Sequence, residues 1–254
     1  MTTQTIIATI FAAFFGLVIG SFLNVCIYRI PLKEEIVYTR SHCMNCGHQL
    51  RWYELIPVLS YLLQGGRCRQ CKERISIQYP MVELMNAIGY VWIFLHEGYC
   101  LESILYCLTT SILIVVAFID EKTMEIPVGC NYLLALLGVV QLISDWTHWW
   151  SYLLGAVCIS GFLLLVYGIT KGRGIGGGDI KLMAASGLLL GAPRIILGFF
   201  IGCVLASVIH VIRMKISKVG NRLAFGPYLC GGIWIAALYG NWLIDWYFSV
   251  TVQT

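Results

Sequence analysis

The strongest constraint on the fold is a series of eight apolar segments along the chain. A helix needs about 20 mostly apolar residues to cross the roughly 30 Å hydrocarbon core of a bilayer. Most segments are close to that length, and they cover residues 6–28, 81–97, 101–119, 127–144, 150–170, 182–193, 195–213 and 229–248. The chain is 59% hydrophobic and 12% charged, whereas a soluble domain is about 25% charged. We therefore expect an all-α polytopic membrane protein with about eight transmembrane helices. Because 182–193 is short and Gly-rich, six or seven full spans with a re-entrant piece is the alternative.

The distribution of lysine and arginine predicts the orientation. Eight basic side chains lie between the first and second spans, whereas residues 1–5 have none. The positive-inside rule places that large loop in the cytoplasm, and alternate counting then places both termini outside. The first segment has neither a basic region before it nor a small-residue cleavage site, so we expect an uncleaved span and not a signal peptide.

Two aspartates lie beside apolar runs. Asp120 ends the run 112–119, and Asp179 follows three glycines, 59 residues later. A carboxylate next to the bilayer core is costly unless it is paired or faces water, so such an acid is a functional candidate. Two carboxyls in one place can share a proton, so that one acts as a general acid while the other activates water. This arrangement suits peptide hydrolysis without a metal, and we expect Asp120 and Asp179 at the cytoplasmic face to be catalytic.

Other classes of protein are weaker interpretations of the same acids. A proton- or ion-coupled transporter would use Asp120 and Asp179 as a relay. Against it, both acids lie at predicted span ends and not at the midplane, and no repeat relates two halves of the chain. A membrane adaptor protein that catalyses no reaction and has a loop held together by zinc would explain the cysteines but not the acids.

Four of the eleven cysteines form two C-x-x-C pairs in the large loop. This spacing lets four thiolates converge on one zinc ion, and disulfides are rare in a reducing cytoplasm. Four thiolates leave no open position for a catalytic water, so the zinc is expected to be structural. The expected ligands are Cys43, Cys46, Cys68 and Cys71.

The glycines before Asp179 also match a dinucleotide-binding pattern, but no βαβ unit surrounds them. We expect them instead to let an extended substrate backbone approach the carboxylate, with a purely structural Gly-rich turn as the alternative. The positions expected to face the substrate are Gly176, Gly178 and Lys181.

Over about residues 16–230 the chain resembles the bacterial type IV prepilin peptidases, the leader peptidase and N-methyltransferase family of GxGD aspartic proteases. The matching stretches are Gly20–Pro31, the cysteine loop with Trp52–Tyr61 and Tyr79–Glu83, Ile119-Asp120 with Ile126-Pro127, and Gly176-Gly-Gly-Asp179-Ile-Lys181. The family's catalytic aspartates carry over to Asp120 and Asp179, and its zinc ligands to the four cysteines of the loop. Two departures, Met44 in place of a usual proline and Val128 after Pro127, disturb none of these residues.

The resemblance implies two reactions at the cytoplasmic side of the bacterial inner membrane. Such enzymes remove a short basic leader from prepilins or pseudopilins, and then methylate the new N-terminal residue with S-adenosylmethionine. The partners implied are these substrates and membrane lipid, and no nucleic acid. Weak candidates for contact with the methyl donor are Asn24, Arg29 and Glu83, for which helix-end packing is an equally good explanation. The expected regions are 10–97, associated with methyl transfer, the peptidase domain 101–215, and a C-terminal span in 216–254.

Overall fold

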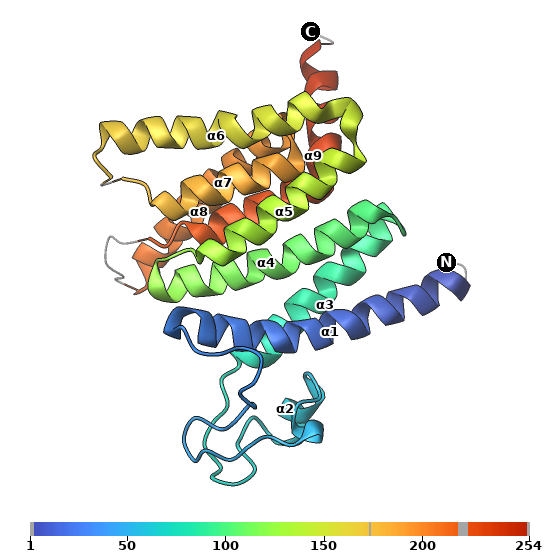
Figure 1. The fold of residues 1–254 in the computed structure, drawn as a ribbon, viewed down its shortest axis with the longest axis vertical. Coiled ribbons are helices and arrows are strands. Elements are labelled where there is room, and N and C mark those ends of the chain that lie inside the picture. Colours follow the sequence, from blue (N-terminus) through green and yellow to red (C-terminus); the bar gives the residue numbers. More distant parts are fainter. Residues whose placement is uncertain (1–2, 173, 218–222, 253–254) are drawn as a thin grey trace. The chain divides into compact units, whose positions relative to one another are not determined.

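The computed structural model describes residues 3–172, 174–217 and 223–252, and within these ranges it contains helices and no β-strand (Figure 1). The α-helices are α1 (Thr3–Leu32), α2 (Leu59–Leu63), α3 (Gln78–Glu97), α4 (Leu101–Thr123), α5 (Val128–Ser144), α6 (Trp149–Ile169), α7 (Gly177–Leu190), α8 (Ala192–Ser217) and α9 (Gly226–Val252). Two short 3-10 helices are η1 (Trp52–Glu54) and η2 (Trp146–His148). The all-α prediction is confirmed, and each predicted apolar segment overlaps an α-helix.

In the part of the chain that the structure describes, four helical segments are long and apolar enough to cross a membrane by length and composition. They are Thr5–Leu32, Leu101–Thr123, Trp146–Ile169 and Ala192–Lys215, and Val128–Ser144 is a shorter apolar helix. Many large apolar side chains on these helices are exposed, among them Phe11, Phe14, Leu164 and Phe200, as expected for a surface that faces lipid. The count of eight spans stays a prediction.

The chain divides into two compact units, residues 1–115 and 116–254. In the first unit, α1 packs on α3 through two glycines. A Cβ added at Gly16 would lie 2.6 Å from the Cα of Ala87, and one at Gly20 would lie 2.7 Å from the Cα of Glu83. Two glycines four residues apart therefore allow the backbones of α1 and α3 to approach closely, as in small-residue packing of membrane helices.

A buried polar network adds to this packing. The side-chain amide of Asn86 donates to the carbonyl of Gly16 at 2.8 Å and accepts from the Ser111 hydroxyl at 2.9 Å. The hydroxyls of Ser111 and Tyr90 also lie 2.9 Å apart. One side chain of α3 is thus tied both to α1 and to the first part of α4, which fixes their register.

In the second unit the short helix α7 is the centre, because it contacts α5, α6, α8 and α9. Its Leu182 and Met183 are fully buried. Glycines again allow close contacts: the backbones of Gly155 in α6 and Gly187 in α7 touch directly. A central helix surrounded by four others holds its first turn, which carries Asp179, in a fixed position.

The structure corrects the predicted start of this helix. The apolar pattern predicts a segment over 182–193, but α7 covers Gly177–Leu190, so Asp179 lies inside the helix and not before it. The reason is that an acid in the first turn is favoured by the helix dipole, so that the helix begins in the polar Gly-rich stretch. It ends where Gly191 takes a φ of +80°, and α8 follows at once. The 14 residues of α7 make a helix of about 21 Å, shorter than the bilayer core.

Candidate functional site

Asp120 is held at the end of α4 by the beginning of α9. Its side chain is buried, with 6% of its surface exposed. The backbone N–H of Gly226, the first residue of α9, donates to Oδ2 of Asp120 at 2.9 Å. A Cβ added at Gly226 would lie only 2.6 Å from that oxygen, so this contact requires glycine. An acid in the last turn of one helix, where the dipole disfavours it, thus receives a donor from the first turn of another.

Asp179 lies in the first turn of α7 and is also buried, with 9% of its surface exposed. Its carboxyl forms a hydrogen bond with the backbone at Gly176, and it interacts electrostatically with Asp120. The structure therefore brings together two acids that are 59 residues apart in the sequence. Two buried carboxyls in electrostatic contact are a physical basis for sharing one proton.

Cys230, in the second turn of α9, completes the surroundings of the pair. It is buried and interacts electrostatically with Asp120, with Asp179 and with Cys130 of α5. The beginnings of α5, α7 and α9 therefore meet at the end of α4. Residues of α7 and α9 therefore lie around the two carboxyls, and Cys130 of α5 lies near Cys230.

An ion pair lies next to the acids. Arg213 of α8 lies 3.0 Å from the carboxylate of Glu121, and its guanidinium donates to the hydroxyl of Tyr228 at 3.4 Å. Glu121 follows Asp120 in α4, and Tyr228 is two residues after Gly226 in α9. Arg213 thus connects the two helix ends whose contact holds Asp120. Sequence reasoning missed this group and Gly226, although the Gly226-Pro227 pair at the start of the last apolar segment is a typical helix-start signal.

The three positions predicted to face the substrate have different surroundings. Gly176 and Lys181 are exposed, whereas Gly178 is partly buried. A Cβ at Gly178 would lie 3.0 Å from Cβ of Ile126, and one at Gly176 would lie 3.1 Å from Oδ2 of Asp179. These glycines therefore allow α7 to pack beside the segment before α5. Their approach to a substrate stays a prediction.

The four predicted zinc ligands lie together in the loop of the first unit. All four Sγ atoms are within 4.8 Å of one another. Those of Cys43 and Cys71 are 3.8 Å apart, and those of Cys46 and Cys68 are 3.9 Å apart. A tetrahedral ion with Zn–S bonds of about 2.3 Å holds its sulfurs about 3.8 Å apart, so the four thiols fit zinc.

Each cysteine pair lies in a tight turn of the same design. The N–H of Cys43 donates to the carbonyl of His48 at 2.9 Å, and the N–H of Cys68 donates to that of Glu73 at 2.8 Å. The residue after each second cysteine has a positive φ, +70° at Gly47 and +60° at Lys72. Backbone N–H groups at Cys71 and Gln70 lower the pKa of Cys68 to about 6, which favours the thiolate form that binds metal.

A buried glutamate supports the first turn. Oε2 of Glu54 accepts from the N–H of Arg51 at 2.9 Å and lies 3.2 Å from the His48 ring. The N–H of Arg51, together with His48, holds the pKa of Glu54 below its ordinary value. His48, two residues after Cys46, is therefore a support of the loop and was not singled out by the sequence pattern.

The three candidates for methyl transfer lie on or beside the α1–α3 contact. Asn24 donates to the carbonyl of Tyr79 at 3.1 Å, and Oε2 of Glu83 accepts from the N–H of Val58 at 2.7 Å. Arg29, at the end of α1, donates to the carbonyls of Glu35 and Thr39 at 3.0 and 2.9 Å. All three side chains are buried and hold α1, α3 and the loop together. The structural explanation is supported for each, and a role in methyl transfer stays a prediction.

Comparison with known proteins points to one family. A family model described as Bacterial Peptidase A24 N-terminal domain matches residues 14–97, and one described as Type IV leader peptidase family matches residues 107–211. A Bacillus subtilis protein is 36% identical over 94% of this chain and 97% of its own length. Proteins from Pseudomonas putida and Neisseria gonorrhoeae are each 33% identical, over 91% and 88% of this chain and 90% and 88% of their own. All three are named prepilin leader peptidase/N-methyltransferase.

The chain belongs to the type IV leader peptidase family. No solved structure matches it. The matched family models and relatives are peptidases, so the transporter considered from the sequence is not supported.

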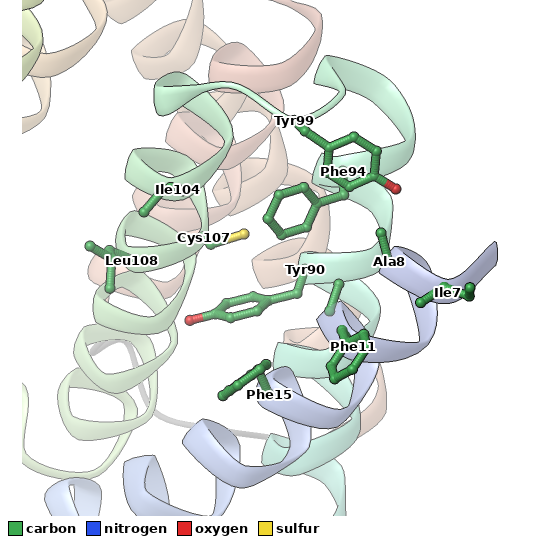
Figure 2. A pocket seen from close by; sticks show the side chains of 11 residues that line it. Ile7, Ala8, Phe11, Phe15, Tyr90, Phe94, Tyr99, Ile104, Cys107 and Leu108 are labelled. Carbon is green, nitrogen blue, oxygen red and sulfur yellow. The ribbon is translucent and has the colours of Figure 1, made fainter. Parts of the chain in front are cut away.

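Because the relatives are also named N-methyltransferases, we asked whether a cavity in the first unit could hold a methyl donor. A cavity of about 540 Å³ in the first unit lies among α1, α3 and α4 (Figure 2). Figure 2 shows Phe11 and Phe15 of α1, Tyr90 and Phe94 of α3, and Cys107 of α4 around it. Its lining is apolar apart from the Tyr90 and Tyr99 hydroxyls and the Cys107 thiol, and the Tyr90 hydroxyl is already bonded to Ser111. The cavity therefore does not fit S-adenosylmethionine, which carries several charges.

Proposed function

We propose that this protein removes the leader peptide from prepilins or pseudopilins and methylates the N-terminal residue that cleavage exposes. The observation that carries the first half is the pair of buried carboxyls, Asp120 and Asp179, in electrostatic contact within a chain that matches leader peptidases over nearly its full length. Leader cleavage is peptide-bond hydrolysis, and a carboxyl pair with one shared proton supplies both the acid and the base that this reaction needs.

In the proposed mechanism, one carboxylate takes a proton from water as the water attacks the scissile carbonyl. The other, protonated carboxyl donates to the carbonyl oxygen, and the proton on the first is then passed to the leaving amine. The N–H of Gly226 and the backbone hydrogen bond at Gly176 hold the two carboxyls in place during these transfers. Neither step requires a metal ion at the acids.

The bilayer would contribute to substrate positioning. A prepilin whose apolar N-terminal helix lies in the membrane and whose basic leader extends into the cytoplasm presents its scissile bond at the membrane surface. If Asp120 and Asp179 lie at that depth, confinement of the substrate supplies much of the proximity that catalysis requires. Gly176, Gly178 and Lys181 are the positions that we assign to substrate approach.

The second half of the proposal rests on the relatives' names, which include N-methyl transfer. The methyl donor in such a reaction is S-adenosylmethionine. The polar groups of Arg29 and Glu83 are used within the fold, and the cavity of the first unit is apolar, so neither fits this donor. We therefore assign no step of methyl transfer to a residue.

The four cysteines are proposed to bind one structural zinc ion. Their sulfur positions suit a tetrahedral site, and the loop between α1 and α3 has only η1 and α2 as regular structure. A metal ion would supply the folding energy that this loop does not obtain from helix packing.

The active site is proposed to face the cytoplasm of a bacterium whose inner membrane holds the protein. A reporter fused after Arg51 should be cytoplasmic, and reporters near His96 and Trp146 should be external. Arg173 and Lys218, which are also expected inside, lie outside the described residues. An external reporter after Arg51 would contradict the orientation.

The direct test of cleavage uses the purified protein in detergent with a purified prepilin-like substrate. Intact mass should show removal of the leader after a defined residue. Because no serine, cysteine or catalytic metal is involved, serine-, cysteine- and metalloprotease inhibitors should leave the rate nearly unchanged. A parent protein that leaves the substrate intact would contradict the proposed function.

A further inference from the structure

The first turn of α5 contains a buried amide without a partner. Asn131 is 6% exposed, and among the described residues neither its Nδ2 nor its Oδ1 has a hydrogen-bond partner. An unpaired polar group inside a protein lowers its stability, so its presence needs an explanation. An amide that offers both a donor and an acceptor suggests a partner that arrives from outside the fold.

The packing of α5 on α7 gives the position of this amide. A Cβ at Gly178 would contact Ile126, just before α5, and a Cβ at Gly138 would lie 3.0 Å from Leu188 and Leu189. The two helices therefore run in the same direction with their beginnings together. Asn131 precedes Gly138 by seven residues, or about two turns, so it lies on the same face of α5. It faces α7 about one turn beyond Asp179, near the level of Leu182.

Electrostatic interactions also link the beginning of α5 to the acid pair. Its neighbour Cys130 interacts with Cys230, and Cys230 interacts with both Asp120 and Asp179. All of these residues belong to the second unit. The unpartnered amide therefore lies beside the site where the peptide is proposed to be cleaved.

The chemistry of the amide selects its partner. An extended peptide has one free N–H and one free C=O on each residue, and an asparagine side chain can accept from the first and donate to the second. Such bonds are strong in a site shielded from water, and they do not depend on the sequence of the substrate. An uncharged amide also avoids adding a third charge beside the two acids.

We propose that Asn131 binds the main chain of the peptide substrate next to the scissile bond. This proposal rests on the proposed function and extends it by a binding residue. Asn131 would hold the peptide against the beginning of α7, so that the scissile carbonyl lies between the two carboxyls. The amide is unpaired in the free protein because its hydrogen-bond partner is the substrate.

The test compares Asn131→Leu with Ser186→Ala. Ser186 of α7 is also fully buried with an unpartnered hydroxyl, but it lies two turns beyond Asp179, away from the proposed cleavage site. Both substitutions remove an unpaired buried group, so both should leave the melting temperature unchanged or raise it. Only Asn131→Leu should lower kcat/KM for cleavage, by about 10- to 100-fold for one or two lost hydrogen bonds and mainly through KM. Asn131→Gln, which keeps the amide, should recover part of the loss.

A substrate series makes the test specific for the main chain. Peptides in which single amides near the scissile bond are replaced by esters should show one position where the parent loses affinity and Asn131→Leu does not. Unchanged kcat/KM in Asn131→Leu, or equal ester effects in both proteins, would overturn the proposal. So would a lower melting temperature with no recovery in Asn131→Gln, which would indicate a packing role. If the parent protein cleaves no substrate, the proposed function itself is contradicted. If the parent cleaves and Asn131→Leu has the same kcat/KM, only the role of Asn131 is contradicted.

Discussion

The cysteine loop and the acid pair are assembled in opposite ways. Each half of the cysteine site forms within a few residues, by bonds such as the one from Cys43 N–H to the His48 carbonyl. The acid pair joins residues from α4 and α7, and Gly226, whose N–H donates to Asp120, lies 106 residues after it. The first site depends on local turns and a metal ion. The second depends on the packing of helices that are far apart in the sequence.

This difference predicts how far the effect of a substitution extends through the protein. The effect of a substitution in the cysteine loop should stay in the loop, because Asp120 and Asp179 belong to the second unit and α7, which carries Asp179, packs on α5, α6, α8 and α9. A change at a helix contact around α7 or α9 should reach the acids even when the altered residue is not an acid.

The largest effect is expected from the acids themselves. Asp120→Asn and Asp179→Asn should each lower cleavage by about 10³-fold or more, because an amide of similar shape cannot take up or release the proton. Both variants should insert and bind zinc like the parent. The rate is measured by intact mass of a prepilin-like substrate. Processing at the parent rate by either variant would rule out the carboxyl pair.

Gly226→Ala tests whether packing controls the acids. The new Cβ would lie 2.6 Å from Oδ2 of Asp120, so the carboxyl or the start of α9 must move. A shift of this kind should lower kcat for cleavage by about 100-fold. Gly168→Ala in α6 is the control, because a Cβ there meets no atom within 4 Å, and it should cleave normally. If both variants cleave alike, the contact of α9 with Asp120 has no role in catalysis.

Cys43→Ser tests whether the loop acts separately. Loss of one thiolate should release the metal and disorder the loop, because the binding energy of such a zinc site is also its folding energy. We expect about one zinc per parent chain by elemental analysis, and none in the variant. Methylation should fall severely, whereas cleavage should fall only in part through weaker substrate docking. A parent without zinc, or a metal-free variant that methylates normally, argues against the assignment.

The smallest effect is expected at Lys72, which has a φ of +60° where the first cysteine turn has Gly47. A left-handed conformation costs a residue other than glycine about 1 kcal/mol. Lys72→Gly should therefore slow zinc loss to a chelator slightly, and Gly47→Ala should accelerate it. Neither should alter cleavage by the acid pair. Faster zinc loss in Lys72→Gly, or slower zinc loss in Gly47→Ala, would contradict the equivalence of the two turns.

The same contrast explains what the sequence predicts well. The helices follow from apolar segment length, and the four cysteines from their spacing, because both signals lie within short stretches of chain. Asp120 and Asp179 stand out as acids beside apolar runs, although only the fold brings them close enough to interact electrostatically. Gly226, Arg213 and Asn131 could not be found in this way. Their importance comes from what lies opposite them, such as the carboxylates of Asp120 and Glu121, and that depends on helix packing.

The start of α7 illustrates the same limit. The apolar pattern begins at Leu182, but the helix begins at Gly177 because a chain with a favourable acid in its first turn can continue as a helix through polar residues. Apolar periodicity reports which residues face lipid or core, and it does not report helix ends. The error matters here because it places Asp179 outside the helix that holds it.

We expect the acid pair to carry out cleavage and the intact cysteine loop to be needed for methylation. One measurement separates these roles, namely the intact mass of one prepilin-like substrate co-expressed with the parent, with Asp179→Asn or with Cys43→Ser. We predict a cleaved and methylated product with the parent, an uncleaved substrate with Asp179→Asn, and a partly cleaved, unmethylated product with Cys43→Ser. Complete loss of cleavage in Cys43→Ser, with the protein still inserted, would contradict the separation of the two regions, and so would cleavage by Asp179→Asn.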